Sequence, residues 1–428
     1  MVSDCRDFND LAYFGGKPVY KGDWPAWPRA GMSAQRALLD VLHGCRWSIS
    51  AKTKCERSYI NIFAQKFAAF IGRRHGVCCS SGSAALRIAL IALGVKAGDE
   101  VIVSGLTWVA VASCVMHLGA VPVLVDVNKN SLVPDPQSIE SLITPVTKAV
   151  IATHMYSSRV NMAAISDICT RHSLQLIEDA SQAHGATLYD KRAGSYGTVS
   201  VFSFQQTKLL TSGEGGIALT DDEELGLLMQ RLRTDGRLYG ETENRGYFGM
   251  DNGSGIMGSN LCMSEFHAAI LLEGLARLDS ENVHRASNKK YLESIIQQID
   301  NVSILQDELP EAGIRTYYKL PISFQSAAFE NIPASVISKI LTSETDLLIE
   351  PLDQPLSNSQ LINISNLREN NRCLPISEKV VKSTVFIPHY ALLGIREDVD
   401  LIFGAITKLN NCAESLSEYF YRGQQNER

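Results

Sequence analysis

Phe202-Ser-Phe-Gln-Gln-Thr-Lys208, followed at once by Leu-Leu-Thr-Ser-Gly-Glu-Gly-Gly216, is the most informative stretch of this 428-residue chain. It places one lysine between an apolar run, which predicts a strand, and a glycine-rich turn. A lysine amine condenses with an aldehyde only when it is neutral. It therefore needs a partly desolvated pocket or a cationic neighbour that lowers its pKa. Lys208 is a candidate for covalent chemistry on these grounds.

A second stretch, Ile177-Glu-Asp179-Ala-Ser-Gln182, follows the apolar run Leu174-Gln-Leu176. An aspartate at the end of an apolar strand can hold a pyridinium nitrogen protonated, although an acid at this place can also be a simple helix cap. A Schiff-base lysine and an aspartate at the ring nitrogen are the pairing that pyridoxal 5′-phosphate (PLP) chemistry requires. Lys208 and Asp179 together predict a PLP site.

The fold follows from the alternation of short apolar strands with helices between about residues 60 and 220. Strands are expected at 101–103, 123–127, 149–153, 174–177, 199–203 and 217–220, and helices at 60–71, 83–93, 108–117, 162–172, 222–233 and 264–278. This alternation predicts an α/β fold with a mostly parallel sheet covered on both faces. Functional groups in such sheets gather where strands end.

Three parts of the chain are expected. Residues 1–30 form an N-terminal arm and residues 31–285 a large PLP-binding domain. The charge density and the helical pattern change after about residue 285, and strands are expected near 316–320 and 385–387, so residues 286–428 form a smaller α+β domain. The segment 240–260 is rich in Gly, Asn, Tyr and Asp and is expected to be a functional or interface loop.

Composition limits the partners and the location. The net charge of −6 is spread without a basic block, which argues against nucleic acid and anionic membranes as partners. No run approaches the roughly 18 apolar residues of a spanning helix, and the N-terminus lacks the regions of a signal peptide, so a cytoplasmic enzyme is expected. Ten cysteines without a Cys-x-x-Cys pair and nine scattered histidines predict buried free thiols and no metal site.

Further residues fit the same cofactor. Ser80-Ser-Gly82-Ser83-Ala84 precedes a helix, and this arrangement makes an anion site, although Ser-Gly-Ser alone is more often an ordinary N-cap. Ser203 is a second candidate for the phosphate or a plain strand-end hydroxyl. Trp108 is placed either to stack on a pyridine ring or in the core. Gln182 is placed to reach the phenolic oxygen of the cofactor, whereas His184 is better explained as a structural histidine.

Four motifs in fixed order carry a resemblance. They are Glu178-Asp-Ala-Ser-Gln-Ala-His184, Phe202-Ser-Phe-x-x-x-Lys208, Gly213-Glu-Gly-Gly216 and Gly258-Ser-Asn260-x-x-Met-Ser-Glu265. From about residue 24 to 410 the chain resembles the DegT-type sugar and cyclitol aminotransferases, a fold-type I PLP family. The resemblance implies Lys208 as the Schiff-base lysine, Asp179 as the pyridinium partner and Gln182 as the contact to the ring hydroxyl. It also implies cofactor contacts from Gly82, Ser83, Ala84, Ser203 and Trp108. Asn260 matches a residue that reaches the phosphate of the neighbouring subunit, which implies a homodimer with shared active sites.

Within this family, Trp24-Pro-Ala-Trp-Pro28, Gln205-Gln206 and Arg315-Thr-Tyr-Tyr318 resemble the L-glutamine:scyllo-inosose aminotransferases of aminocyclitol antibiotic pathways. The resemblance implies transfer of an amino group from L-glutamine or L-glutamate to a ketocyclitol such as scyllo-inosose, or to a keto-sugar. Three alternatives remain open: an aromatising enzyme similar to 3-amino-5-hydroxybenzoate synthase, a nucleotide-keto-sugar aminotransferase, and a PLP-binding regulator without turnover. A dehydrogenase is disfavoured because no Gly-x-Gly-x-x-Gly follows the early strands.

The acceptor site is expected near His154, Tyr156, Tyr317 and His389. The chain departs from the family pattern here, because His154-Met-Tyr156 runs into Ser157-Ser158-Arg159 where a glycine is usual. Thr153 also replaces a small apolar residue. Both departures are expected near the substrate ring, and whether they alter the choice of acceptor is left open by the sequence.

Overall fold

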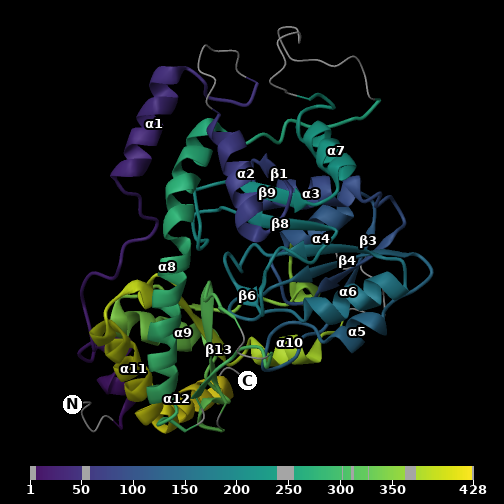
Figure 1. Ribbon diagram of the computed structural model, residues 1–428. Helices are drawn as coiled ribbons and strands as arrows, with labels where there is room; N and C mark the ends of the chain where they lie inside the picture. The colour runs from purple at the N-terminus through teal and green to yellow at the C-terminus, as the bar shows by residue number, and fades with distance from the viewer. Residues whose placement is uncertain are drawn as a thin grey trace.

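The computed structural model describes residues 6–50, 58–238, 255–300, 302–309, 313–325, 327–361 and 373–426. Most of the predicted loop 240–260 lies outside these residues. A seven-stranded sheet with the order β1-β9-β8-β5-β4-β2-β3 forms the centre of the molecule (Figure 1). Its strands are β1 (His75–Cys79), β2 (Glu100–Ser104), β3 (Val121–Val125), β4 (Thr147–Thr153), β5 (Gln175–Asp179), β8 (Val199–Ser203) and β9 (Gly216–Thr220). Only β9 runs antiparallel to its neighbours, so the predicted mostly parallel α/β sheet is confirmed.

Helices cover both faces of this sheet. On one face lie α3 (Gly82–Ala92), α4 (Ala110–Met116) and α7 (Glu223–Arg233), and on the other α2 (Tyr59–Ile71), α6 (Met162–Arg171) and the first half of α8 (Glu265–Ile296). Val101 and Val103 pack in the core under α3 and α4, while Ile102 between them packs in the core under α6. Because both faces are buried, β2 is apolar throughout rather than alternating.

A second sheet lies below the first and is antiparallel, with the order β10-β11-β13-β12. Its strands are β10 (Val302–Ile304), β11 (Lys319–Phe324), β12 (Glu350–Pro351) and β13 (Thr384–Pro388), and α9 (Ala334–Thr345), α11 (Arg396–Asn411) and α12 (Ala413–Asn426) pack around it. This is the α+β arrangement expected after residue 285. Shorter elements are the helices α5 (Pro136–Glu140) and α10 (Pro375–Val380), the hairpin β6 (Thr187–Leu188) and β7 (Lys191–Arg192), and 3-10 turns at Phe8–Asp10, Ala12–Phe14, Ala327–Phe329, Leu356–Asn358 and Ala391–Leu393.

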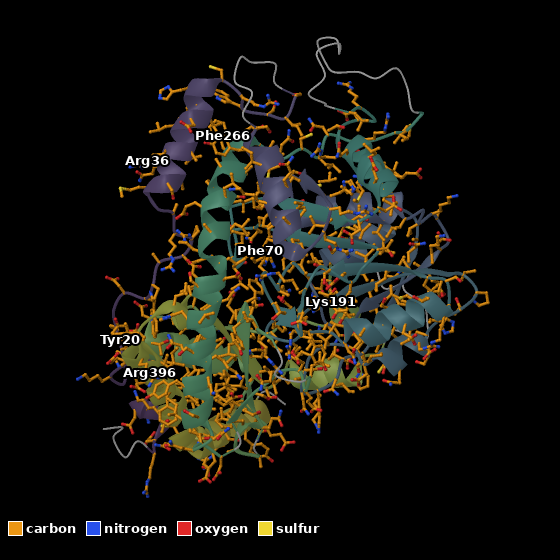
Figure 2. All side chains as sticks on the ribbon, in the orientation of Figure 1. Tyr20, Arg36, Phe70, Lys191, Phe266 and Arg396 are labelled. Carbon is orange, nitrogen blue, oxygen red and sulfur yellow. The ribbon has the colours of Figure 1, made fainter. Side chains whose placement is uncertain are left out.

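The helix α8 connects the two sheets and runs the height of the molecule in Figure 1. Leu271 and Leu278 are buried in the core of the large sheet, and Leu292 and Ile296 are buried in the core of the small one. α1 (Met32–Gly44) lies along the outside of α8. Phe266, at the start of α8, contacts Trp47 just after α1. Figure 2 labels Phe266 at this end of α8.

The described residues contain neither a candidate membrane span nor a candidate metal cluster. No described helix is both long and apolar enough to cross a membrane. Across the described ranges, no group of three or more His, Cys, Asp or Glu side chains is arranged to hold a metal ion.

Candidate functional site

The candidate site lies at one edge of the large sheet. β2, β4, β5 and β8 are parallel, and β1 has the same direction because it is antiparallel to β9, which is antiparallel to β8. The carboxyl ends of all five strands therefore meet at this edge. Asp179 is the last residue of β5, and the segments that follow the other four strands carry Gly82, Trp108, Tyr156 and Lys208.

Lys208 lies in the loop between β8 and β9, and its Nζ is 4.2 Å from the ring centroid of Tyr318. Burial lowers the pKa of this amine from 10.5 to about 8, although the charges of Asp179 and Asp353 act to raise it. A substantial fraction of Lys208 is therefore neutral in mildly alkaline solution, which is the form that attacks an aldehyde.

Three side chains from distant parts of the chain hold the loop before Lys208. Trp27 donates its indole N–H to the carbonyl oxygen of Gln206 at 3.0 Å, and His389 donates Nε2–H to that of Thr207 at 3.1 Å. The Thr207 hydroxyl shares a 2.8 Å hydrogen bond with the Tyr318 hydroxyl. The rings of Trp27 and His389 also meet edge to face, with centroids 4.5 Å apart. The lysine is thus positioned by residues before the large sheet and by the small sheet together.

Asp179 ends β5 and is buried. Burial raises the pKa of its carboxyl, while hydrogen bonds from Ser181 and the charges of Lys208 and His154 lower it; burial prevails. The Ser181 N–H donates to Oδ1 at 3.0 Å, and no salt bridge to Asp179 occurs within the described ranges. A buried carboxylate without a cationic partner is costly, so this site favours a cation such as a protonated ring nitrogen.

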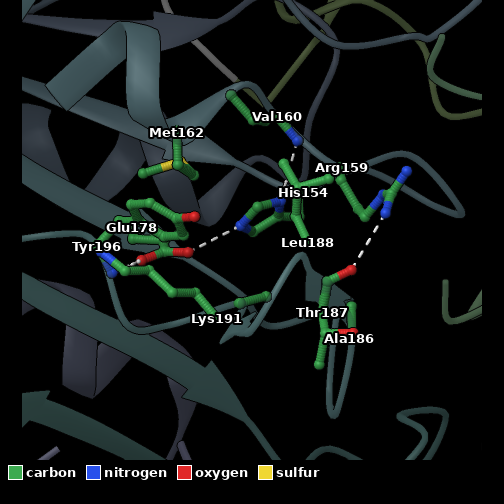
Figure 3. Close-up of a pocket in the computed structure, with 11 residues that line it drawn as sticks. His154, Arg159, Val160, Met162, Glu178, Ala186, Thr187, Leu188, Lys191 and Tyr196 are labelled. Carbon is green, nitrogen blue, oxygen red and sulfur yellow. Dashed lines mark hydrogen bonds and ion pairs between the residues drawn. The ribbon is translucent and has the colours of Figure 1, made fainter. Parts of the chain in front are cut away.

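Glu178 precedes Asp179 and belongs to a separate network on the other side of β5. His154 accepts the Val160 N–H at Nδ1, so its Nε2 carries the proton and donates to Glu178 at 3.0 Å (Figure 3). Gly194, Tyr196 and Gly197 also donate their N–H groups to Glu178. Burial raises the pKa of Glu178, but the His154 and backbone bonds outweigh it and keep this pKa below its usual range. Both nitrogens of His154 are therefore engaged in support of the strand ends.

Gly82 allows a close approach at the candidate phosphate position. A Cβ on Gly82 would lie 2.7 Å from the Cβ of Ser203, so only glycine fits there. The Ser81 hydroxyl caps α3 by accepting the Ala84 N–H at 3.1 Å. The N–H groups of Gly82 and Ser83 make no hydrogen bond to any described residue and point out from the start of an eleven-residue helix. Ser203 faces this helix start.

Trp108 and Asn260 are both exposed, which bears on their expected contacts. Trp108 precedes α4 at the same sheet edge and has 59% of its surface exposed, so it does not lie in the core. Asn260 lies in an exposed segment paired with Thr234, and its neighbour Leu261 accepts the Ser80 N–H beside the start of α3. Within the described ranges, Asn260 makes no hydrogen bond to Lys208.

Gln182 and Tyr156 connect the ends of β4 and β5. The Gln182 side-chain oxygen accepts the Tyr156 N–H at 2.8 Å, and its amide nitrogen lies 3.4 Å from the Met155 sulfur. Tyr156 has a left-handed backbone with φ of 57°. Its hydroxyl donates to Asp353 Oδ2 at 3.2 Å, which carries it toward the small sheet.

His184 and His389 are buried near the lysine, and neither takes up a proton readily. Burial lowers the pKa of His184 from 6.5 to about 3 and that of His389 well below 6.5. His184 donates Nε2–H to the carbonyl oxygen of Ser203 at 2.9 Å. The Nδ1 of each ring has no hydrogen-bond partner among the residues that the structure describes. Two neutral acceptors are thus left beside the lysine loop.

Some predicted residues lie elsewhere. Tyr317 packs in the core of the small sheet, and its neighbour Tyr318 is the one that faces Lys208. Ser157 and Arg159 bind the segment after β10. The Ser157 hydroxyl donates to the Leu305 carbonyl oxygen, and Arg159 binds the Asp307 carboxylate through its backbone N–H at 2.7 Å and its guanidinium at 3.1 Å. Figure 3 shows Arg159 turned away from Glu178 toward Thr187.

Thr153 does lie beside the site. It is the register partner of Asp179, and its hydroxyl is buried without a partner in the described part of the chain.

Sequence reasoning missed Tyr318, Asp353 and the role of Trp27. The sequence did point to two of them, because Trp27 lies in the motif Trp24-Pro-Ala-Trp-Pro28 and Tyr318 is adjacent to the predicted residue Tyr317. No sequence pattern pointed to Asp353, because it follows the two-residue strand β12 and reaches the site only through the packing of the two sheets.

Comparison with known proteins gives consistent relatives over nearly the whole chain. An L-glutamine:2-deoxy-scyllo-inosose aminotransferase of Streptoalloteichus tenebrarius is 38% identical over 93% of this chain and 97% of its own. An L-glutamine:scyllo-inosose aminotransferase of Streptomyces griseus is 37% identical over 95% of this chain and 99% of its own.

Among solved structures, 3-amino-5-hydroxybenzoic acid (AHBA) synthase superposes with a TM-score of 0.79 at 26% identity, covering 91% of this chain and 100% of that one. An aminotransferase from Psychrobacter cryohalolentis superposes with a TM-score of 0.81 at 25% identity, covering 90% of this chain and 98% of that one. These neighbours confirm the expected fold-type I architecture. The model of the DegT/DnrJ/EryC1/StrS aminotransferase family matches residues 41–407, and the chain belongs to this family.

Proposed function

We propose that this protein is a PLP-dependent aminotransferase that moves the amino group of L-glutamine to a ketocyclitol of the scyllo-inosose type. The observation that carries the proposal is the pairing at the sheet edge: a partly buried lysine with a lowered pKa and a buried aspartate without a cationic partner in the described ranges. The names of the relatives that are 37–38% identical supply the donor and the class of acceptor.

The residues present fit PLP. Lys208 is the candidate to bond the aldehyde, and Asp179 is the candidate to pair with the ring nitrogen. The free N–H groups at the start of α3, with Ser203 against Gly82, suit a phosphate dianion. Trp108 offers an exposed indole for stacking at the same edge. When bound, PLP supplies an electrophilic carbon and a ring that withdraws electrons.

Lys208 then acts as the proton carrier. Its neutral amine takes a proton from the Cα of the amino donor as a general base, and the resulting ammonium returns a proton as a general acid. The Tyr318 ring, 4.2 Å away, stabilises the ammonium form through its π face. Trp27, His389 and Tyr318 fix the preceding residues, so the amine keeps its position during both transfers. Asp179 keeps a proton on the ring nitrogen.

A homodimer with shared sites is part of the proposal. Met32 and Leu39 on α1, Trp47 after it, and Trp108 at the site all expose half or more of their surface. Large apolar side chains exposed in this number are typical of a subunit interface. Asn260, exposed beside the start of α3, would then serve the site of the second copy.

The test uses the purified protein reconstituted with PLP. L-Glutamine should bleach the visible absorbance of the cofactor, and scyllo-inosose or 2-deoxy-scyllo-inosose should restore it. Lys208→Ala should lower the transamination rate at least about a thousandfold because it removes both the covalent anchor and the proton carrier. Lys66→Ala, an exposed lysine on α2, is the matched control and should keep full activity. Unchanged turnover in Lys208→Ala would refute the assignment.

AHBA synthase is the second candidate because its structure superposes over 91% of this chain. An aromatising enzyme would release a product with new ultraviolet absorbance from a cyclohexenone substrate. Transamination of a ketocyclitol leaves a saturated ring and no such band. The same reaction mixtures therefore separate the two functions.

A further inference from the structure

A cluster of polar side chains from both sheets lies beside Lys208. It consists of Tyr156 from the end of β4, Tyr318 and Lys319 at the start of β11, and Asp353 just after β12. The Lys208 Nζ lies 4.2 Å from the centroid of the Tyr318 ring, and the Lys319 Nζ lies 5.9 Å from the same centroid. The Asp353 charge also acts on the Lys208 amine. The cluster and the lysine therefore share one space.

Asp353 is the only member of this cluster with a carboxylate, and only one of its oxygens is used. Oδ2 accepts the Tyr156 hydroxyl at 3.2 Å and lies 3.9 Å from Lys319 Nζ. Oδ1 accepts no hydrogen bond from the residues that the structure describes, and the side chain keeps 34% of its surface exposed. Burial holds the pKa of Tyr156 well above 10, so its phenol stays a donor and fixes the carboxylate in place.

An oriented carboxylate with a free oxygen suits a particular kind of ligand. It accepts strong hydrogen bonds from hydroxyl groups, which a polyhydroxylated ring offers in number. It repels the α-carboxylate of glutamine and the diphosphate of a nucleotide-linked sugar. A neutral cyclitol carries no charge to be repelled. The negative charge of Asp353 thus suits the neutral acceptor better than the donor.

We infer that Asp353 is a specificity residue of the acceptor half-reaction: it binds ring hydroxyls of the neutral ketocyclitol, held in position by Tyr156 and Lys319. The inference rests on the proposed function and adds which residue distinguishes a neutral cyclic polyol from charged substrates. Asp353 comes from the small sheet, whereas Lys208 comes from the large one. The acceptor is therefore bound between them.

The test separates the two half-reactions in Asp353→Asn, which keeps the shape and removes the charge. Enzyme loaded with pyridoxamine 5′-phosphate is mixed with scyllo-inosose, and enzyme loaded with PLP is mixed with L-glutamine. The acceptor half-reaction should fall about 10- to 100-fold, because a hydrogen bond to a charged group is lost. The glutamine half-reaction should not fall, since Asp353 makes no favourable contact with the donor and the variant removes a charge that repels its α-carboxylate. Asp167→Asn, 70% exposed on α6, is the matched control and should change neither.

A binding measurement on cofactor-free enzyme gives a second readout. scyllo-Inositol has the ring hydroxyls but no ketone, so it cannot react. Saturation-transfer NMR should detect its binding to the wild type and not to Asp353→Asn.

If the wild type accepts the ketocyclitol and Asp353→Asn accepts it equally well, the inference about Asp353 falls and the proposed function stands. Equal losses in both half-reactions would also overturn it. A wild type that is inert toward every ketocyclitol would refute the proposed function itself.

Discussion

Lys208 is the residue whose protonation controls cofactor capture. Its amine has a pKa of about 8 instead of 10.5 because burial penalises the ammonium form more than Asp179 and Asp353 favour it. The neutral form therefore dominates above about pH 8 and is lost as the pH falls below it. We predict that the rate at which cofactor-free enzyme captures PLP rises with pH around a midpoint near 8. Stopped-flow absorbance across a pH series measures this rate.

Asp179→Asn supplies the internal check on that midpoint. The variant removes a charge that raises the pKa of Lys208, so the midpoint should move to lower pH. A wild-type midpoint near the ordinary lysine value would show that the amine is not desolvated in solution.

The residue scale also shows what sequence patterns convey. Lys208 and Asp179 were identified because their types and motifs are tied to a chemistry. Tyr318 was passed over for Tyr317, since two adjacent tyrosines give no sign of which faces the site until the strand is placed. The structure buries Tyr317 in the core of the small sheet and leaves Tyr318 over Lys208. Asp353 depends on contact between the two sheets, which no local pattern encodes.

At the scale of elements, the loop after β4 is tied to the segment after β10. Arg159 and Arg315 both pair with Asp307, and all three side chains are at least nine-tenths buried. We predict that Asp307→Asn lowers the free energy of unfolding by about 3–5 kcal/mol, because it removes the carboxylate that two buried guanidinium groups share. Urea denaturation followed by circular dichroism measures the change.

The control for this prediction is Asp167→Asn, whose carboxylate is exposed and pairs with Arg171 on the surface of α6. Its unfolding curve should match that of the wild type, because exposed pairs contribute little. A loss in Asp307→Asn no larger than in this control would mean that the Asp307 pair is accessible to water in solution.

Element boundaries were predicted well where the apolar period was regular and poorly elsewhere. The helix predicted at 264–278 continues to Ile296. The prediction ended too early because Arg285, Asn288 and Lys289 interrupt the apolar pattern, although the structure buries all three with polar partners. The domain boundary proposed at residue 285 therefore falls inside a continuous helix. β1 was not predicted, since His75-Gly76 at its start lacks strand propensity and its pairing with β9 is distant in sequence.

At the scale of the whole molecule, Leu11 and the helices α11 and α12 meet in the small sheet's core. Leu11 is fully buried there, and the Glu344 carboxylate accepts the Ala12 and Val19 N–H groups while pairing with Lys408. Residues 8–19 of the expected N-terminal arm thus pack against the small sheet and its helices. Between these residues and α1, the Trp27 side chain contacts the loop before Lys208. Sequence patterns could not show this, because the contacts join residues more than 300 positions apart.

The proposed dimer makes a prediction about mixed subunits. Suppose that Asn260 serves the partner's site and Lys208 its own. Lys208→Ala then disables the site of the subunit that carries it. Asn260→Asp disables the site of the other subunit, because a carboxylate would repel the phosphate. A heterodimer of the two variants keeps one intact site, formed by Lys208 of one chain and Asn260 of the other.

Random mixing yields heterodimers as half of all dimers, each with one of two sites active, so the mixture should recover about one quarter of the wild-type transamination rate. The measurement is the rate after the two inactive variants are unfolded together, refolded and reconstituted with PLP. Each variant refolded alone is the control and should stay inactive. Recovery depends on the two residues coming from different chains: if Asn260 acted on the Lys208 of its own chain, every mixed dimer would carry one site lacking Asn260 and one lacking Lys208. A mixture as inactive as its components would therefore place Asn260 in the site of its own subunit.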